Sequence, residues 1–255
     1  LLKNNCINKK QIVSKPFYFI NEIDDNIKIN QDLDYLFSKQ GPLANNIKNY
    51  EKREGQYHFT NDCINNIENS GILIAEADTG IGKSFSYLIA CLLNLNERKI
   101  ILSSSTHSLQ DQLFNKDIPL ISKTLNIKVK ATIAKGMNNY FCKDRFNYVI
   151  ENINKYLIPE EILEFLSLIV WSEKTLTGDI AECNSFRIKN NEKIWGLVKY
   201  ETESCSVNNN KCFYLKMLQE SKNSNIVIVN HSLLANSFLN KKDDILGGNY
   251  VCIID

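Results

Sequence analysis

The segment with the clearest chemical pattern is rich in glycine and reads Glu-Ala-Asp-Thr-Gly-Ile-Gly-Lys-Ser over residues 76–84. Glycines at this spacing let backbone N–H groups converge on phosphate oxygens, and the N-terminus of a helix that follows favours bound anions. A lysine and a serine at the end of such a loop reach the β- and γ-phosphates and ligate Mg²⁺, respectively. Only Ala77 departs from the general GxxxxGK[ST] pattern, because a glycine is usual there. The segment therefore predicts a site for a nucleotide with Mg²⁺, formed by Thr79, Gly80, Gly82, Lys83 and Ser84.

Cysteine is the second residue type whose spacing could do chemistry. The chain has eight cysteines and no CxxC pair, and its polar N-terminus does not read as a signal peptide. We therefore expect a cytoplasmic protein with free thiols in place of disulfides. In apolar segments a cysteine acts as a small hydrophobe, which is the expectation for Cys63, Cys91 and Cys252.

Four further cysteines fall in one middle region of the chain. Four thiolates can hold an iron–sulfur cluster, and a tetrahedral set of four also suits zinc. The residues alone leave a cluster, a zinc ion and an insertion without metal all open. The candidates are Cys142, Cys183, Cys205 and Cys212.

A phosphate loop needs a strand before it and a helix after it. The apolar run at 72–75 predicts the strand, and residues 83–94 have the length and apolar content of a helix packed in a core. An amphipathic stretch at 108–125, interrupted by Pro119, and a stretch at 57–68 predict further helices. Continuous apolar runs predict the remaining strands at 99–103, 129–134, 225–230 and 250–254. This alternation is typical of an α/β fold with a parallel sheet covered on both faces.

The predicted elements are interrupted between the third and fourth strands. Residues 136–224 contain no clear strand and hold the four clustered cysteines, so we expect an inserted, mostly helical subdomain there. Residues 1–40 show weak periodicity and are expected to form an extension or linker. The two parts of the main domain would then be residues 41–135 and 225–255.

Composition limits the classes of function. The 255 residues are 44% hydrophobic and 23% charged, which excludes wholesale disorder. No apolar run approaches the roughly 20 residues that span a bilayer, so we expect no membrane partner. The formal net charge is +1, and any affinity for nucleic acid must therefore come from a local patch.

Several segments occur in the order that is found in the DinG/XPD branch of superfamily 2 DNA helicases, and the chain resembles that family. Residues 77–84 resemble its motif I, and residues 250–255 fit the strand that leads into its DEAH box. The other matching segments are 50–56 (the YExRxxQ element), 105–113 (motif Ia), 135–142 (the KGRxNYxC run) and 225–234 (the segment before motif II).

The resemblance implies a RecA-like P-loop NTPase sheet and an ATP-dependent motor that moves 5′ to 3′ on single-stranded DNA, with DNA junctions as further partners. It implies that Gln56 recognises the adenine with Arg53 beside it in the nucleotide site, and that Ser84 and Asp255 hold Mg²⁺. Lys83 and Asp255 would be the catalytic residues. The glutamate after Asp255, the second motor domain and its arginine finger lie outside this sequence, so we expect a fragment that ends at motif II and is inactive alone.

The same resemblance implies a [4Fe-4S] cluster in the insertion. Cys142 stands at the first ligand position of the family, Cys212 at the last and Cys205 at an intermediate one. Cys183 lies farther upstream than the family pattern has it. The family's motif Ia contacts the DNA backbone, which suggests Ser104, Ser105, Thr106 and Gln110, with Asn230 and His231 beside them.

Two other classes of function are weighed against the helicase. One is another P-loop nucleotide-binding protein, such as a nucleotide kinase, which would need a substrate lid in place of a cysteine-bearing insertion. The other is a metal-bearing adaptor that binds nucleic acid without helicase activity, against which the intact Gly-Lys-Ser at 82–84 argues.

Overall fold

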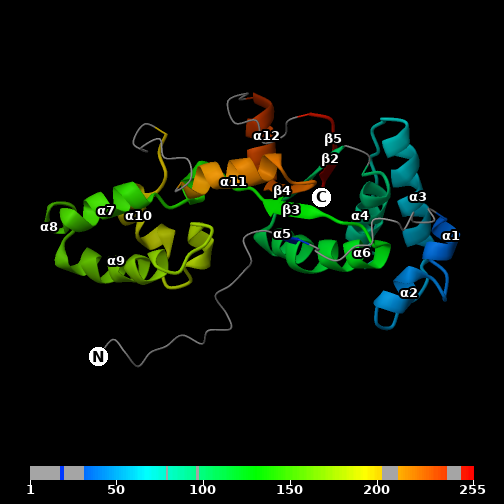
Figure 1. Cartoon of the computed structure of the whole chain (residues 1–255), viewed down its shortest axis with the longest axis horizontal. Coiled ribbons are helices and arrows are strands. Elements are labelled where there is room, and N and C mark those ends of the chain that lie inside the picture. Colours follow the sequence, from blue (N-terminus) through cyan, green and yellow to red (C-terminus); the bar gives the residue numbers. More distant parts are fainter. Residues whose placement is uncertain (1–17, 20–31, 79, 96–97, 203–211, 240–247) are drawn as a thin grey trace. The chain divides into compact units, whose positions relative to one another are not determined.

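The computed structural model describes residues 18–19, 32–78, 80–95, 98–202, 212–239 and 248–255. These residues form two compact units. The insertion unit consists of residues 135–220, and the sheet unit combines the described residues before 135 with those after 220. Figure 1 shows the strands and helices that make up the two units.

The sheet has its strands in the order β1-β3-β4-β2-β5. Neighbours among β2 to β5 run parallel, whereas β1 is antiparallel to β3. The four strands predicted at 99–103, 129–134, 225–230 and 250–254 are confirmed. The observed strands are β1 (Tyr18–Phe19), β2 (Lys99–Ser104), β3 (Lys130–Ile133), β4 (Ile226–Asn230) and β5 (Tyr250–Ile254).

The burial of β2 shows that the sheet is covered on both faces. Ile100, Ile101 and Leu102 are at most 1% exposed, although successive side chains of a strand point to opposite faces. Residues 226–229 of β4 are equally buried. Because each such side chain contributes about 1.5–3 kcal/mol when it leaves water, these two strands anchor the core.

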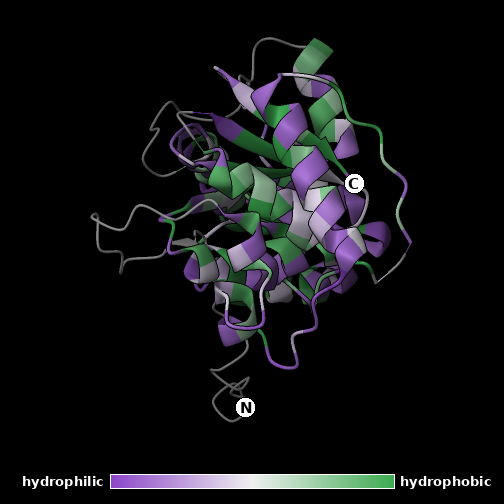
Figure 2. Cartoon of the chain, turned by 90° about the vertical axis from the view of Figure 1, so that its right-hand side faces the viewer, coloured by the Kyte–Doolittle hydropathy of each residue, from purple (hydrophilic) through white to green (hydrophobic). Residues whose placement is uncertain are grey.

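Helices of the sheet unit pack on one another through apolar faces and shared hydrogen bonds. α4 (Lys83–Leu93) is buried from Ser86 onward and packs against α3 (Glu54–Glu68) and α6 (Ile118–Leu125). The hydroxyls of Thr60 and Ser86 both donate to the carbonyl of Gln56, at 2.8 and 3.2 Å, which joins α3 to α4. Figure 2 shows the alternation of hydrophilic and hydrophobic residues along such helices.

The N-terminal boundary of the main domain lies earlier than the sequence predicts. α1 (Leu33–Leu36) and α2 (Pro42–Asn46) precede α3, and α3 itself begins at Glu54 rather than near residue 57. Leu36 is 5% exposed and Phe37 is fully buried in the core of the sheet unit. Residues before 40 therefore contribute to this core and to the sheet, through α1 and β1.

The helical stretch predicted at 108–125 is one helical path with a widened turn. α5 (His107–Gln112) leads into a π-helical turn at Leu113–Asp117, and α6 begins at Ile118 with Pro119 in its first turn. Proline has no N–H to donate, and its ring clashes with the carbonyl four residues earlier. The π-turn changes the backbone hydrogen-bond pattern just before the proline, so the helix can continue through it.

The insertion unit has its own hydrophobic core. The aromatic rings of Phe141, Phe146 and Phe165 pack in sequence, with centroid separations of 5.0 and 5.3 Å. Trp171 contacts the same cluster, 5.3 Å from Phe141. The helices around it are α7 (Lys143–Glu151), α8 (Ile153–Tyr156), α9 (Pro159–Ser172), α10 (Glu192–Val198) and α11 (Phe213–Lys222), with 3₁₀ turns at Met137–Asn139, Ile180–Glu182 and Ile188–Asn190.

The strand predicted at 72–75 is wrong in this structure. These residues are irregular, and Ile72 and Ile74 are 92% and 94% exposed. β5 pairs with β2 on one side, and no described strand pairs with its other side. A short apolar run forms a buried strand only when neighbouring strands satisfy its backbone, and residues 72–75 pair with none of the described strands.

None of the helices in the described ranges combines the length and apolar composition that crossing a bilayer requires.

Candidate active site

Parallel strands gather the candidate residues at one edge of the sheet. β2, β4 and β5 end at this edge, so Ser103, His231 and Asp255 lie close together. The Ser103 hydroxyl and His231 Nδ1 are 2.7 Å apart. The backbone N–H of Asp255 donates to the carbonyl of Ser103 at 2.9 Å. Crevices at the carboxyl ends of parallel strands are where α/β proteins bind ligands.

The glycine-rich loop approaches this edge in the conformation that its sequence predicts. Gly80 and Gly82 have φ angles of +91° and +94°, which favour glycine. α4 begins directly after Gly82, at Lys83, so its unpaired first N–H groups and its positive dipole end face the loop. Thr79 lies outside the described residues. The loop therefore retains the geometry of an anion site.

Arg53 and Gln56, both predicted for the nucleotide site, lie against this loop. The Arg53 guanidinium donates to the carbonyl of Gly80, and the Gln56 side-chain amide donates to the carbonyl of Gly82 at 3.5 Å. A methyl group added to Gly82 would lie 2.5 Å from the Gln56 amide nitrogen. The segment at 53–56 thus lines one side of the loop.

Lys83 is tethered within the loop. Its Nζ donates to the carbonyl of Ala77 at 2.8 Å, and its side chain is partly buried. The bond spans the turn from the start of the loop to the start of α4. The ammonium group has three donors, so it keeps donors for a phosphate oxygen while it is bonded to this carbonyl.

Tyr87 connects α4 to Asp255, one of the two predicted Mg²⁺ ligands, and it was not among the residues predicted from the sequence. Its hydroxyl donates to Asp255 Oδ2 at 2.9 Å, across 168 residues of sequence. Ser84 lies one helical turn earlier on α4, and burial raises the pKa of Tyr87 far above its usual range. The one available signal was the i, i+3 spacing, which puts Ser84 and Tyr87 on the same face of α4.

The motif Ia candidates divide into buried and exposed residues. The Ser104 side chain is fully buried and its hydroxyl donates to the carbonyl of Thr106 at 3.3 Å, while Gln110 is 3% exposed. The Thr106 hydroxyl caps α5 by accepting from the N–H of Leu109. Ser105 and Thr106 are both exposed. These two of the four candidates have the accessibility that a contact with DNA needs.

The four predicted cysteine ligands do not come together among the described residues. Within these ranges, no group of three or more histidine, cysteine, aspartate or glutamate side chains could hold a metal ion. Cys183 is 5% exposed in the core of the insertion unit, with its sulfur 3.9 Å from the carbonyl of Ser167. Burial raises the pKa of the Cys183 thiol, which disfavours the thiolate that a metal requires. Cys205 lies outside the described residues.

Cys142 and Cys212 lie in neighbouring segments of the insertion unit. The ring of Phe141 is 6.3 Å from the ring of Phe213, and Lys143 Nζ is 5.3 Å from the centroid of Phe213. The residues on both sides of Cys142 therefore contact the residue that follows Cys212. Cys142 is buried and Cys212 is partly buried.

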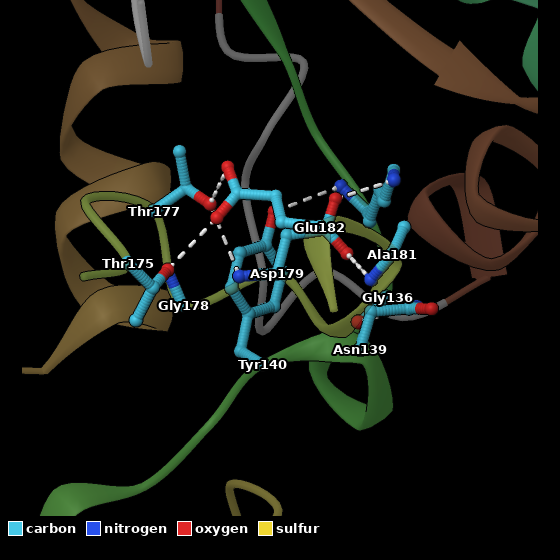
Figure 3. Close-up of polar contacts among 10 residues, drawn as sticks. Gly136, Asn139, Tyr140, Thr175, Thr177, Gly178, Asp179, Ala181 and Glu182 are labelled. Atoms are coloured by element: carbon cyan, nitrogen blue, oxygen red, sulfur yellow. Dashed lines mark hydrogen bonds and ion pairs between the residues drawn. The ribbon is translucent and has the colours of Figure 1, made fainter. Parts of the chain in front are cut away.

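A polar network fixes the segment that leads to Cys142. Lys135 forms an ion pair with Asp179, and both side chains are less than one-fifth exposed. The Glu182 carboxylate accepts hydrogen bonds from the hydroxyls of Thr175 and Thr177 at 2.8 and 2.6 Å (Figure 3). Lys135 therefore has a structural role, because its ammonium group is held by Asp179 within the insertion unit.

Comparison with known proteins identifies the family. Residues 57–180 match the DEAD/DEAH box helicase family. The chain is 34% identical over 203 residues to the ATP-dependent DNA helicase YoaA of Haemophilus influenzae, which covers 78% of this chain and 31% of the relative. It is 31% identical over 202 residues to the YoaA of Escherichia coli, with 77% and 31% covered. It is also 31% identical over 221 residues to the 3'-5' exonuclease DinG of Bacillus subtilis, with 82% and 23% covered.

The chain thus spans about a third of the length of the YoaA relatives and about a quarter of that DinG. The parallel sheet, the phosphate loop and the family match agree with one another, and the predicted α/β RecA-like fold is confirmed. The chain belongs to the DEAD/DEAH box helicase family, among its DinG-like members.

Proposed function

We propose that this chain is the ATP-binding part of an ATP-dependent DNA helicase that moves 5′ to 3′ on single-stranded DNA. The observation that carries the proposal is the hydrogen bond from the Tyr87 hydroxyl to Asp255 Oδ2, which brings the end of β5 to the helix that begins with Lys83 and Ser84 after the glycine-rich loop. A hydroxyl and a carboxylate are oxygen ligands of the kind that Mg²⁺ prefers, and phosphate oxygens and water complete its shell. The two YoaA relatives are named ATP-dependent DNA helicases, which supports the same assignment.

In this proposal each residue of the site has one task. Lys83 donates to a phosphate oxygen from its place beside the Ala77 carbonyl and neutralises charge on the γ-phosphate. Bound Mg²⁺ would neutralise the charge that develops on the phosphates, and Ser84 and Asp255 would hold it. Arg53 and Gln56 lie against the loop from the side on which the adenine would enter.

Translocation needs more than this site. Motors of this class complete phosphoryl transfer with a water-positioning side chain and an arginine finger. The chain spans only 31% of the YoaA relatives, so we propose that a second motor domain supplies these groups and shares the grip on single-stranded DNA or junctions.

The iron–sulfur cluster is a separate part of the proposal. The full set of four cysteines does not fit the described residues, because Cys183 belongs to the apolar core. The neighbouring segments of Cys142 and Cys212 support these two as thiolate ligands, and Cys205 precedes Cys212 by seven residues. We therefore propose Cys142, Cys205 and Cys212 as the candidates for a metal or cluster and Cys183 as a residue of the core.

The test of nucleotide binding uses a fluorescent ATP analogue with Mg²⁺. Lys83→Ala should weaken binding about a hundredfold or more, because charge-assisted hydrogen bonds to phosphate contribute roughly 1.5–3 kcal/mol each. The matched control is Lys123→Ala, which removes an exposed lysine from the last turn of α6 and should leave binding unchanged. Wild-type protein that does not bind the nucleotide contradicts the proposal and favours the adaptor.

A second measurement separates the helicase from other P-loop proteins. Anisotropy of labelled single-stranded DNA should report binding that weakens as salt rises, since backbone contacts release counterions. Nucleotide binding without any affinity for DNA, together with phosphoryl transfer to a nucleoside monophosphate, would instead identify a nucleotide kinase.

A further inference from the structure

We propose that Tyr87 is a positioning residue that orients the Asp255 carboxylate for Mg²⁺ in the nucleotide site. This inference rests on the proposed function, because it assigns a task to Tyr87 in the same site. Neither the phosphate-loop pattern nor the strand that ends before Asp255 points to this tyrosine.

Tyr87 is held rigidly enough for such a task. It lies in the first half of α4, is 4% exposed and belongs to the core of the sheet unit. A side chain packed in a core occupies one rotamer, and its hydroxyl therefore has a fixed place. From this place the Tyr87 hydroxyl donates to Asp255 Oδ2 at 2.9 Å.

Two hydrogen bonds hold Asp255 in place. It follows the last residue of β5, and its backbone N–H donates to the carbonyl of Ser103. The bond from Tyr87 binds Oδ2, and within the described residues no side chain or backbone group is bonded to Oδ1. The carboxylate is thereby oriented with one oxygen left for a ligand.

The same hydrogen bond places Asp255 beside the first turns of α4. Ser84 and Tyr87 are three residues apart in this helix and therefore lie on the same face. Because Tyr87 holds Asp255 Oδ2 at 2.9 Å, the carboxylate is anchored to the helix that carries the Ser84 hydroxyl before any metal arrives. Preorganisation of this kind lowers the cost of ordering the ligands when the ion binds.

The test compares nucleotide affinity with Mg²⁺ and with EDTA, so that the tightening due to the metal is measured separately. Tyr87→Phe keeps the buried ring and removes only the hydroxyl. We expect unchanged affinity in EDTA and roughly a tenfold loss of the Mg²⁺-dependent tightening, which is the value of one hydrogen bond to a charged group. Asp255→Asn should lose most of this tightening as well.

The control is a tyrosine of the insertion unit that also donates a hydrogen bond. The Tyr156 hydroxyl donates to the Tyr148 hydroxyl at 3.4 Å, so Tyr156→Phe should leave both affinities unchanged. A double-mutant cycle completes the design. If Tyr87 acts through Asp255, then Tyr87→Phe has no further effect on metal dependence in the Asp255→Asn background.

Each outcome decides between the inference and the function on which it rests. Wild-type protein that binds no nucleotide in either buffer overturns both. If Asp255→Asn removes the Mg²⁺-dependent gain in nucleotide affinity but Tyr87→Phe retains it, the role of Tyr87 alone is overturned. If Tyr87→Phe weakens nucleotide binding equally in Mg²⁺ and in EDTA, the role of Tyr87 is also overturned, because a general disturbance of the loop would act in both buffers.

Discussion

The amide of Gln56 lies so close to Gly82 that a side chain at position 82 would have to displace it. A methyl group at position 82 would lie 2.5 Å from Gln56 Nε2, and the φ angle there is +94°. The contact couples the start of α3 to the glycine-rich loop, which are 26 residues apart. The glycine at 82 therefore serves two purposes: it permits the left-handed turn, and it leaves room for the predicted adenine-binding residue.

Two glycine variants should separate these purposes. Gly80→Ala meets no atom within 4 Å, so its cost is the positive φ alone, about 1–2 kcal/mol. Gly82→Ala adds the collision with Gln56 and should reduce nucleotide affinity more strongly. Titration with a fluorescent nucleotide checks the order, and equal losses in the two variants would show that the contact with Gln56 does not matter.

Arg145 should be the most sensitive charged residue of the insertion unit. Its guanidinium donates to the carbonyls of Leu197 and Gly196 at 3.0 and 2.7 Å and also pairs with Glu201. Arg145→Ala leaves these partners unsatisfied and should lower the free energy of unfolding by about 2–3 kcal/mol in urea titrations. Lys193→Ala, which breaks an exposed pair with Glu161, should change it by less than about 0.5 kcal/mol.

Cys183 and Cys142 should differ in what they contribute. Cys183→Ser places a hydroxyl in an apolar core and should destabilise the fold by about 1–3 kcal/mol without changing iron or zinc content. Cys142→Ser should lower the metal content of anaerobically purified protein. Elemental analysis and chemical unfolding of the same samples check both expectations. Loss of metal in Cys183→Ser would place that cysteine among the ligands after all.

Asp117 should make the stability depend on pH. Burial raises the pKa of its carboxyl in the folded state, and the bond from Gln112 only partly opposes this. An acid whose folded pKa is raised favours folding fully below its ordinary pKa, and this contribution disappears as pH rises through the folded pKa. Asp117→Asn should therefore stabilise the protein at pH 7, and the gain should shrink toward pH 4. Thermal unfolding at the two pH values measures the difference; a gain that is larger at pH 4 would contradict it.

Local patterns predicted the central strands and the loop correctly. The runs at 99–103 and 225–230 are apolar throughout, as strands buried on both faces require, and their lengths fit strands rather than helices. The glycines at positions 80 and 82 predict the left-handed backbone conformation of the loop. The burial of Cys63 and Cys91, at 7% and 1% exposure, followed from the same helical patterns.

Other features depend on partners that a local pattern does not contain. Residues 72–75 have the composition of a strand, but a strand also needs a neighbour with which to pair. Tyr87 reads as one more apolar residue of a core helix, because its partner Asp255 is 168 residues away. The family pattern already sets Cys183 apart from Cys142, but only the structure shows that Cys183 belongs to the hydrophobic cluster of the insertion unit.

The exposed segment at 72–75 has a consequence for how the chain behaves at high concentration. Ile72 and Ile74 point into water, and β5 offers a row of backbone groups that no described strand covers. Exposed apolar residues and open strand edges are the features through which chains recruit one another into assemblies. With a net charge of only +1, weak electrostatic repulsion opposes such encounters. Self-association that grows with protein concentration should therefore set the practical limit on handling this chain.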